Sequence, residues 1–268
     1  MTDEALDRLG RVLDELAPVV VAFSGGADSS FLAAASHRHL GRDRVRVVTA
    51  VSPSLAPQER EDCRSLAAEW GLDWHEVFTH EMDDEAYARN DADRCAHCKS
   101  ALMDAIEVLT GLDGPGTVVL GVNLDDLGDH RPGQEAAASR GARFPLVEAG
   151  FTKAMVREAS RQMGLRTWDK PAAACLASRL PYGVPVTMGR LSSVERAETG
   201  LRSLGFTSLR VRHYEETARI EVPIDDLPRV LDHRREVVDA VRAAGYRYVT
   251  VDLEGLRSGN LNAALAQR

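Results

Sequence analysis

A glycine-rich run near the start of the chain has the residue types of a phosphate-binding loop. Residues 19–30 read VVVAFSGGADSS, an apolar β-branched stretch followed by two glycines and the start of a helical pattern. A strand that turns through glycines into a helix presents free N–H groups and the positive end of the helix dipole to one point, which suits an anion. Backbone and hydroxyl donors would come from Ser24, Gly25, Gly26 and Ser29. Asp28 would lie beside the anion, so we expect Mg²⁺ to bind between them.

A glycine–serine turn in which Ser24 or Asp28 caps the helix is the simpler alternative for this run. The run lacks the lysine of a Walker A motif and the spacing of a dinucleotide fingerprint. We therefore predict a phosphate site of another type, with Asp28 as a catalytic residue.

Three of the four cysteines form a candidate metal site. Cys95 and Cys98 are the ends of a CxxC, and Cys175 lies in a distant segment. Two thiolates at this spacing can chelate one ion or cluster, and a third can complete the site. Several interpretations stay open: a [4Fe–4S] cluster, a zinc ion with His97 as fourth ligand, a redox dithiol, or inert thiols. Cys63, at an apolar helix position, is predicted to be a buried core residue.

A third group of chemical residues follows a predicted strand, in the run GVNLDDLGDHRPG. Its carboxylates Asp125, Asp126 and Asp129 would lie at the same sheet edge as the glycine-rich loop. They could hold Mg²⁺ or orient the neighbouring arginine, and a solvated acidic turn is the alternative. Arg179 is predicted to clamp an anion, because its planar guanidinium pairs with phosphate or carboxylate through two hydrogen bonds.

Charged residues of the C-terminal part are harder to interpret. Arg210 and Arg212 alternate along a predicted strand, so both guanidinium groups lie on one face and could bind a phosphate. A solvent-facing strand would have the same pattern. The acidic residues of this part read, from their positions alone, as surface charges: Glu198, Glu221, Asp225 and Asp226.

The composition limits the class of protein. The 268 residues suffice for one large domain or two smaller ones. No apolar run approaches the roughly 18 residues that cross a bilayer, and the acidic, amphipathic start is unlike a secretory signal. We predict a cytoplasmic protein without membrane attachment, in which cysteines serve as reactive thiols or ligands rather than disulfides. The net charge of −8 argues against nucleic acid as a partner.

Apolar β-branched segments alternate with helical patterns over the first two-thirds of the chain. This alternation predicts an α/β fold with a doubly wound parallel sheet and a nucleotide site at the first strand–helix turn. The predicted strands are Val19–Phe23, Val45–Val51, Trp74–Val77 and Thr117–Val122. The predicted helices are Asp3–Leu16, 27–39, Gln58–Trp70, Ala101–Thr110 and Thr152–Met163.

The pattern changes after Trp168. Residues 169–186 are rich in Pro, Ala and Gly and are predicted to form a functional loop that carries Cys175. A smaller α+β domain follows, so we predict two domains, 1–168 and 169–268. Its elements are helix Gly189–Leu204, strands Ser208–His213 and Thr217–Val222 joined by a hairpin, helix Leu227–Ala244 and strand Tyr246–Leu253.

The SGGADSS run resembles the SGGxDS signature of the PP-loop ATP pyrophosphatases. In that superfamily the loop binds the pyrophosphate end of ATP, and AMP is transferred to a substrate. The resemblance implies a sheet of PP-loop type, with ATP and Mg²⁺ as cofactors.

Longer blocks resemble the LarE family of ATP-dependent sulfur transferases. They are CAHCKSAL, GVNLDDLGDHRPG, ACLASRLPYG, LRVRHYEETARIEVP and YRYVTVDLEGLRSGNLN. Members adenylate the carboxylates of a pyridinium biscarboxylate mononucleotide and convert each to a thiocarboxylate, for the nickel-pincer cofactor of lactate racemase. The resemblance implies that Arg210 and Arg212 bind the phosphate of this substrate. It also implies a secondary metal site of Glu198, Glu221 and a nearby aspartate at a subunit contact, in a homohexamer built through the second domain.

The source of the sulfur differs between branches of this family. The best-known branch gives up the sulfur of one sacrificial cysteine, and the matching position here is Ala174, with Cys175 next to it. That branch also lacks the CxxC of Cys95 and Cys98. The pattern resembles instead the three-cysteine branch, which implies a [4Fe–4S] cluster on these thiolates and a sulfide donor as partner.

Together these features predict two half-reactions. A substrate carboxylate attacks the α-phosphorus of ATP, and sulfide then displaces AMP, with Asp125 and Asp126 positioning cation or substrate. Three rivals remain: a PP-loop tRNA thiolase, an ATP-dependent amidase-like ligase, and a zinc-stabilised nucleotide-binding protein without sulfur chemistry.

Overall fold

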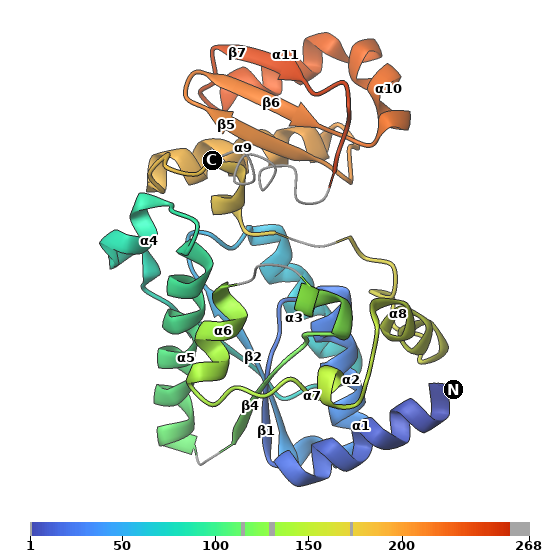
Figure 1. Ribbon diagram of the computed structural model, residues 1–268. Coiled ribbons are helices and arrows are strands. Elements are labelled where there is room, and N and C mark those ends of the chain that lie inside the picture. Colours follow the sequence, from blue (N-terminus) through green and yellow to red (C-terminus); the bar gives the residue numbers. More distant parts are fainter. Residues whose placement is uncertain (1, 114–115, 129–131, 172–173, 258–268) are drawn as a thin grey trace. The chain divides into compact units, whose positions relative to one another are not determined.

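The computed structural model describes residues 2–113, 116–128, 132–171 and 174–257, and the chain divides into two compact units (Figure 1). The first unit comprises residues 1–81 and 95–173, and the second comprises 82–94 and 174–268. Residues 82–94, which the sequence placed in the first domain, thus pack with the second. That the first part binds the nucleotide, and that the second binds the substrate and forms the homohexamer, stay predictions.

A four-stranded parallel sheet forms the centre of the first unit. Its strands lie in the order β3-β2-β1-β4, and every neighbouring pair is parallel. The bounds are β1 Val19–Ala22, β2 Val45–Val51, β3 Trp74–Phe78 and β4 Thr117–Leu120. The helices are α1 Thr2–Leu16, α2 Ala27–Leu40, α3 Pro57–Trp70, α5 Arg94–Asp113, α6 Pro132–Ser139, α7 Pro145–Glu148 and α8 Lys153–Gln162.

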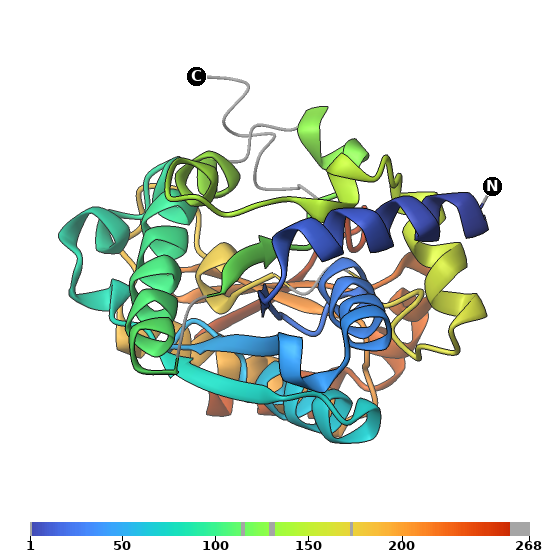
Figure 2. The same cartoon turned by 90° about the horizontal axis from the view of Figure 1, so that it is seen from below.

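Both faces of this sheet are covered by helices, as the sequence predicted. Val19 and Val21 of β1 belong to a core with α1, α2, α3 and α8, whereas Val20 between them packs toward α5. Figure 2 shows α2 and α5 on opposite sides of the strands. Side chains that alternate between two buried faces explain why β1 is apolar at every position.

Some helical details of the first two-thirds differ from the prediction. Helix α5 begins at Arg94 rather than near Ala101, so it includes the CxxC. Its first turn escaped detection because its residues are mostly only half-buried, and fully buried apolar positions start at Leu102. Helices α4 (Glu85–Arg89), α6 and α7 were not predicted, since each is too short for an apolar period.

The second unit is the predicted small α+β domain. Its sheet has the order β5-β6-β7, with an antiparallel β5–β6 hairpin and a parallel β6–β7 pair. Glu215, in the hairpin turn, has a positive φ of 51°. The predicted helix 227–244 is two helices that meet at His233. The elements are α9 Met188–Ser203, β5 Arg210–Tyr214, β6 Thr217–Glu221, α10 Leu227–Asp232, α11 Arg234–Ala243 and β7 Tyr248–Val251.

Over the described parts of the chain, the helices are all too short or too polar to span a membrane.

Candidate functional site

The glycine-rich run forms a tight turn between β1 and α2. Gly25 has a φ of 68°, a left-handed conformation that favours glycine. Ser29 Oγ accepts a hydrogen bond from Ser24 N at 3.2 Å and lies 3.1 Å from Ser24 Oγ. Gly26 is the N-cap of α2 and has no side chain to cap it. The alternative in which Ser24 or Asp28 caps the helix is therefore wrong, and the turn keeps the geometry of an anion site.

The end of β4 lies against this turn. A β-carbon on Gly121 would lie only 2.7 Å from Ser29 N and 2.8 Å from the carbonyl carbon of Asp28. Only a glycine permits this approach, and it brings the segment after β4 beside the loop, as the sheet-edge argument predicted.

Asp28 is joined to that segment through Asn123. The Asp28 Oδ1 atom accepts a hydrogen bond from Asn123 Nδ2 at 3.0 Å, and Asp28 Oδ2 forms an ion pair with Lys153 Nζ. Asp126 Oδ2 accepts from Asn123 N at 3.1 Å, and Asp125 Oδ2 accepts from Lys153 N at 2.5 Å. Two shared partners thus bring the three predicted carboxylates together. Asp129, the fourth acidic residue of the prediction, lies outside the described residues.

Sequence reasoning missed both Asn123 and Lys153 as site residues. Asn123 stands inside the GVNLDD run, and its full burial is the feature that marks it as structural support for the site. Lys153 is 125 positions from Asp28 and begins α8 after the N-cap Thr152. A helix start predicts its backbone conformation, but no local pattern predicts its partner.

A second lysine, Lys170, adjoins the glycine turn. Lys170 Nζ donates to Glu59 Oε2 at 2.8 Å and to Asp62 Oδ2 at 3.0 Å, and it would lie 3.8 Å from a β-carbon on Gly25. Burial alone would lower the pKa of Lys170, but the two carboxylates outweigh burial and raise it. Cys63 lies next to the same glycine, fully buried, and burial raises its pKa to about 11. The prediction that Cys63 is a core residue is confirmed.

The three candidate ligand cysteines belong to different units. Cys95 and Cys98 lie three residues apart in the first turn of α5, hence on one face of the helix, with Cys95 exposed and Cys98 half-buried. Cys175 is the N-cap of a short 3₁₀ helix, Leu176–Arg179, in the second unit. Thiolates are the ligands that iron–sulfur clusters use, so the donor chemistry fits such a group. Among the described residues of either unit by itself, no three His, Cys, Asp or Glu side chains form a metal-binding group.

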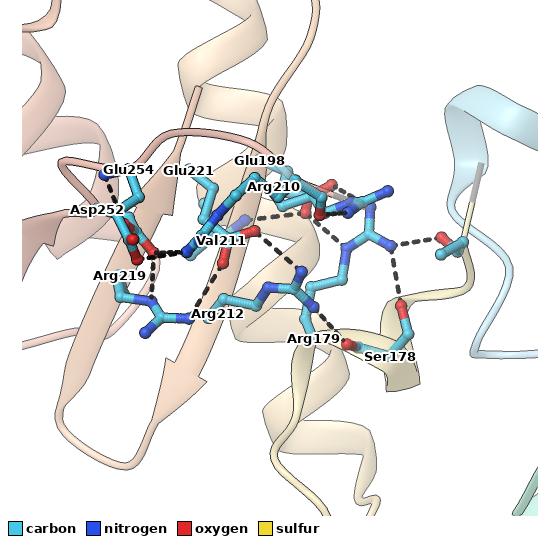
Figure 3. A network of polar contacts seen from close by, with 12 residues as sticks. Ser178, Arg179, Glu198, Arg210, Val211, Arg212, Arg219, Glu221, Asp252 and Glu254 are labelled. Carbon is cyan, nitrogen blue, oxygen red and sulfur yellow. Dashed lines mark hydrogen bonds and ion pairs between the residues drawn. The ribbon is translucent and has the colours of Figure 1, made fainter. Parts of the chain in front are cut away.

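Arg179 lies in a buried polar network of the second unit (Figure 3). Its Nε is 2.8 Å from Glu198 Oε1, and its Nη1 donates to the carbonyls of Ala174 at 2.5 Å and Cys175 at 3.1 Å. Burial alone would raise the pKa of Glu198, but Arg179, Val211 N and Arg202 together lower it. The guanidinium of Arg179 thus holds the turn of Cys175, and its role as an anion clamp stays a prediction.

Arg212 lies in the same network and is not on a solvent-facing strand. Its Nη1 donates to the Ser178 carbonyl at 2.8 Å, and its Nη2 is 2.9 Å from Glu221 Oε2 (Figure 3). Arg212 is 3% exposed, so the surface alternative is wrong for this residue. Arg210 is half-buried, and burial, then the charges of Arg212 and Arg179, lower its pKa.

The acidic residues assigned to a secondary metal site are ion-paired. Glu198 pairs with Arg179 and Arg202, and Glu221 pairs with Arg212 and Arg219. Both carboxylates are fully buried, so they are not the surface charges that their positions suggested. Asp225 is exposed and Asp226 half-buried. The metal site stays a prediction.

The fold and the loop define a class of protein. A glycine turn after the central strand of a parallel sheet, with an aspartate in the first turn of the next helix, is a nucleotide-binding domain of PP-loop type. Consistently, residues 4–110 match the family model described as asparagine synthase.

Similarity over the whole chain identifies the family. The chain is 36% identical over 255 residues to the pyridinium-3,5-bisthiocarboxylic acid mononucleotide synthase of Lactiplantibacillus plantarum. The aligned residues cover 95% of this chain and 92% of that protein. The chain belongs to the LarE family. It is also 42% identical, over the full length of both chains, to an uncharacterised protein of Synechocystis. An uncharacterised protein of Methanocaldococcus jannaschii is 23% identical over 90% of this chain and 91% of its own.

Proposed function

We propose that this chain is an ATP-dependent sulfur transferase that makes thiocarboxylates from the carboxylates of pyridinium-3,5-biscarboxylic acid mononucleotide. The observation that carries the proposal is the 36% identity, across 95% of the chain, to a synthase named for the bisthiocarboxylic product. The glycine turn with Asp28 supports ATP as the activating substrate.

The first half-reaction uses the loop of the first unit. The phosphates of ATP lie at the N–H groups of the Ser24–Ser29 turn, and Asp28 supplies a carboxylate oxygen for Mg²⁺, the ligand type this ion prefers. A substrate carboxylate attacks the α-phosphorus, the bond from phosphorus to pyrophosphate breaks, and an acyl-adenylate forms. The loop N–H groups stabilise the charge that develops on the departing pyrophosphate. Asp125 and Asp126 hold this edge of the sheet through Lys153 and Asn123.

The second half-reaction replaces AMP with sulfur. Cys95, Cys98 and Cys175 would hold a [4Fe–4S] cluster, which when bound supplies the sulfide. Sulfide forms the new bond to the acyl carbon, the bond from carbon to the AMP oxygen breaks, and AMP leaves with its electron pair. The contribution of Arg179 is to fix the carbonyls of the Cys175 turn.

The arginines of β5 are proposed to bind the phosphate of the mononucleotide. Arg210 is half-buried and carries a guanidinium that suits a phosphate. Arg212 is engaged by Glu221 and Ser178, so it would bind phosphate only by sharing its donors with them. Association into a homohexamer, as the family resemblance implies, is part of the same proposal.

An anaerobic assay with reconstituted protein tests the proposed function. Substrate mononucleotide and Mg·ATP should give AMP, pyrophosphate and a product whose mass shows one oxygen exchanged for sulfur at each carboxyl. Cys175→Ala should lose multiple turnover, while the matched control Cys63→Ala should keep its iron and sulfide content, because Cys63 is a buried core residue. Zinc without iron, or AMP formation that depends on ammonia and not on the three cysteines, would contradict the proposal. Salt-sensitive binding of bulk tRNA would favour the tRNA thiolase instead.

A further inference from the structure

Helix α6 packs against the turn of α5 that carries the CxxC. A β-carbon on Gly133, the second residue of α6, would lie 2.8 Å from the Cys95 carbonyl oxygen and 2.9 Å from Lys99 Cγ. Atoms at these distances overlap, so a side chain at this position would force one of the two helices to shift. Figures 1 and 2 both show α6 alongside α5. The two backbones thus meet at Gly133 and Cys95, so closely that only glycine fits.

A second set of contacts holds the other end of α6 on α5. Arg140, directly after α6, donates from Nη1 to the Ser100 carbonyl at 2.9 Å, and its Nη2 donates to Glu107 Oε2 at 3.0 Å. By contrast, the turn of α5 that faces the glycine is less buried, with Cys95 exposed and Cys98 half-buried. Because α6 is anchored, an added methyl group would displace the turn of Cys95 rather than α6.

Helix α6 also contacts the strand end beside the glycine turn. Ala137 of α6 is fully buried in one cluster with Leu120 and Val122, the residues on either side of Gly121. One short helix therefore packs on the segment that approaches the nucleotide loop and on the turn of Cys95. In the proposed reaction, sulfur must meet an acyl-adenylate formed at that loop. A misplacement of about 1 Å between reacting groups can cost about a hundredfold in rate, so this packing matters for the transfer of sulfur.

We propose that Gly133 is a positioning residue of the cysteine site. It lets α6 approach α5, and the contact with the Cys95 carbonyl sets the direction of the Cys95 thiol, since both groups are attached to the same Cα. Cys95 is thereby placed to act as a ligand together with Cys98 and Cys175. The inference rests on the proposed function, in which these three thiolates hold the group that supplies sulfide.

Cobalt binding by reduced, metal-free protein tests this role without any turnover. Co²⁺ held by thiolates absorbs light through sulfur-to-metal charge transfer, and the intensity increases with the number of thiolates bound. The full chain is titrated as wild type, Gly133→Ala, Cys95→Ala and the double variant Gly133→Ala/Cys95→Ala. The matched control is Gly189→Ala, because Gly189 is likewise the second residue of a helix and a β-carbon there meets nothing within 4 Å. Thermal unfolding verifies that each variant is folded.

Gly133→Ala should lose about one-third of the charge-transfer intensity, as Cys95→Ala does, because either change leaves two of three thiolates on the metal. The double variant should lose no more than Cys95→Ala alone, since Gly133 acts through Cys95. Gly189→Ala should give the wild-type spectrum. In Gly133→Ala the affinity for Mg·ATP, measured by calorimetric titration, should stay unchanged, whereas thiocarboxylate formation by the reconstituted protein should fall.

The outcomes separate this inference from the proposed function. A wild-type cobalt spectrum in Gly133→Ala overturns the role of Gly133 and leaves the proposed function standing. A further loss in the double variant overturns it as well, because the substitution would then act on the fold and not through Cys95. Absence of charge-transfer absorption in the wild-type chain overturns the proposed cysteine site and this inference together.

A milder variant serves if Gly133→Ala does not fold. Arg140→Gln releases the other end of α6 from α5 and leaves the glycine contact unobstructed. It should lower the charge-transfer intensity while Cys95 is present and have no effect in Cys95→Ala. An unchanged spectrum in both backgrounds overturns the proposal that α6 positions Cys95.

Discussion

Arg179 and Glu198 form an ion pair with two contacts inside the second unit: Nε lies 2.8 Å from Oε1, and Nη2 lies 3.3 Å from Oε2 (Figure 3). Glu198 is fully buried, and its Oε1 also accepts from Val211 N at 3.1 Å. Because Arg179 donates to the carbonyl of Cys175, this pair ties the cysteine turn to helix α9 and strand β5.

Glu198→Gln should destabilise the protein strongly. The substitution leaves Arg179 as a buried charge without its carboxylate, which costs about 3–5 kcal/mol. Urea unfolding followed by circular dichroism measures the change. The matched control is Glu195→Gln, a half-buried position on the same helix, which should change the free energy of unfolding by about 0.5 kcal/mol or less. Equal changes in the free energy of unfolding would show that the Arg179–Glu198 ion pair does not stabilise the fold, because each variant removes one negative charge from the same helix.

The same carboxylate should make stability depend on pH in the acid range. The pKa of Glu198 is lower in the folded protein than its ordinary value, so the folded state binds its proton less readily than the unfolded state does. Its contribution is complete above the unfolded pKa of about 4.3 and is lost as the pH falls through the folded pKa. The free energy of unfolding, measured at a series of pH values from neutral downward, should therefore fall more steeply once the pH is below about 4.3. Glu198→Gln should lose this part of the pH dependence, and an unchanged profile in the variant would contradict the assignment.

The central sheet could be predicted from sequence because its signals are local. Val19, Val20 and Val21 are buried on both faces of β1, so the apolar run directly reports a covered parallel strand. The glycine turn could be predicted for the same reason, since strand, Gly25 and helix follow one another in the chain. By contrast, the first turn of α5 could not be predicted from the sequence. Cys95 is exposed and Cys98 half-buried, so this turn has no apolar periodicity.

The contacts of the site depend on residues far apart in sequence. The pairing of Lys153 with Asp28 arises only when α8 packs on α2, and nothing near either residue predicts it. The burial of Glu198 and Arg212 was missed for the related reason that charge suggests the surface. Each is buried with an opposite charge from another element, and a single segment does not reveal that partner.

The cysteines should differ sharply in reactivity before any cluster is assembled. Cys95 is exposed, whereas Cys63 is fully buried and its pKa is raised to about 11, so almost none of it is thiolate at neutral pH. Brief iodoacetamide treatment of metal-free, reduced protein at neutral pH should modify Cys95 and spare Cys63, as peptide mass mapping will show. Unfolding in urea should make Cys63 react as well. Rapid modification of Cys63 in the folded protein would mean that the core beside Gly25 opens easily.

Gly121→Ala should disturb the nucleotide loop specifically. The new methyl would lie 2.7 Å from Ser29 N and 2.8 Å from the carbonyl carbon of Asp28, both backbone atoms that cannot rotate away. Relief requires β4 and the loop to separate, at a cost of about 1–3 kcal/mol, so both the free energy of unfolding and the affinity for Mg·ATP should fall. Gly111→Ala is the matched control, because a β-carbon there meets nothing within 4 Å and alanine favours the α5 helix. That control should bind ATP as the wild-type chain does and gain up to about 1 kcal/mol of stability. If Gly121→Ala unfolds and binds ATP like Gly111→Ala, the close approach of β4 is not what shapes the loop.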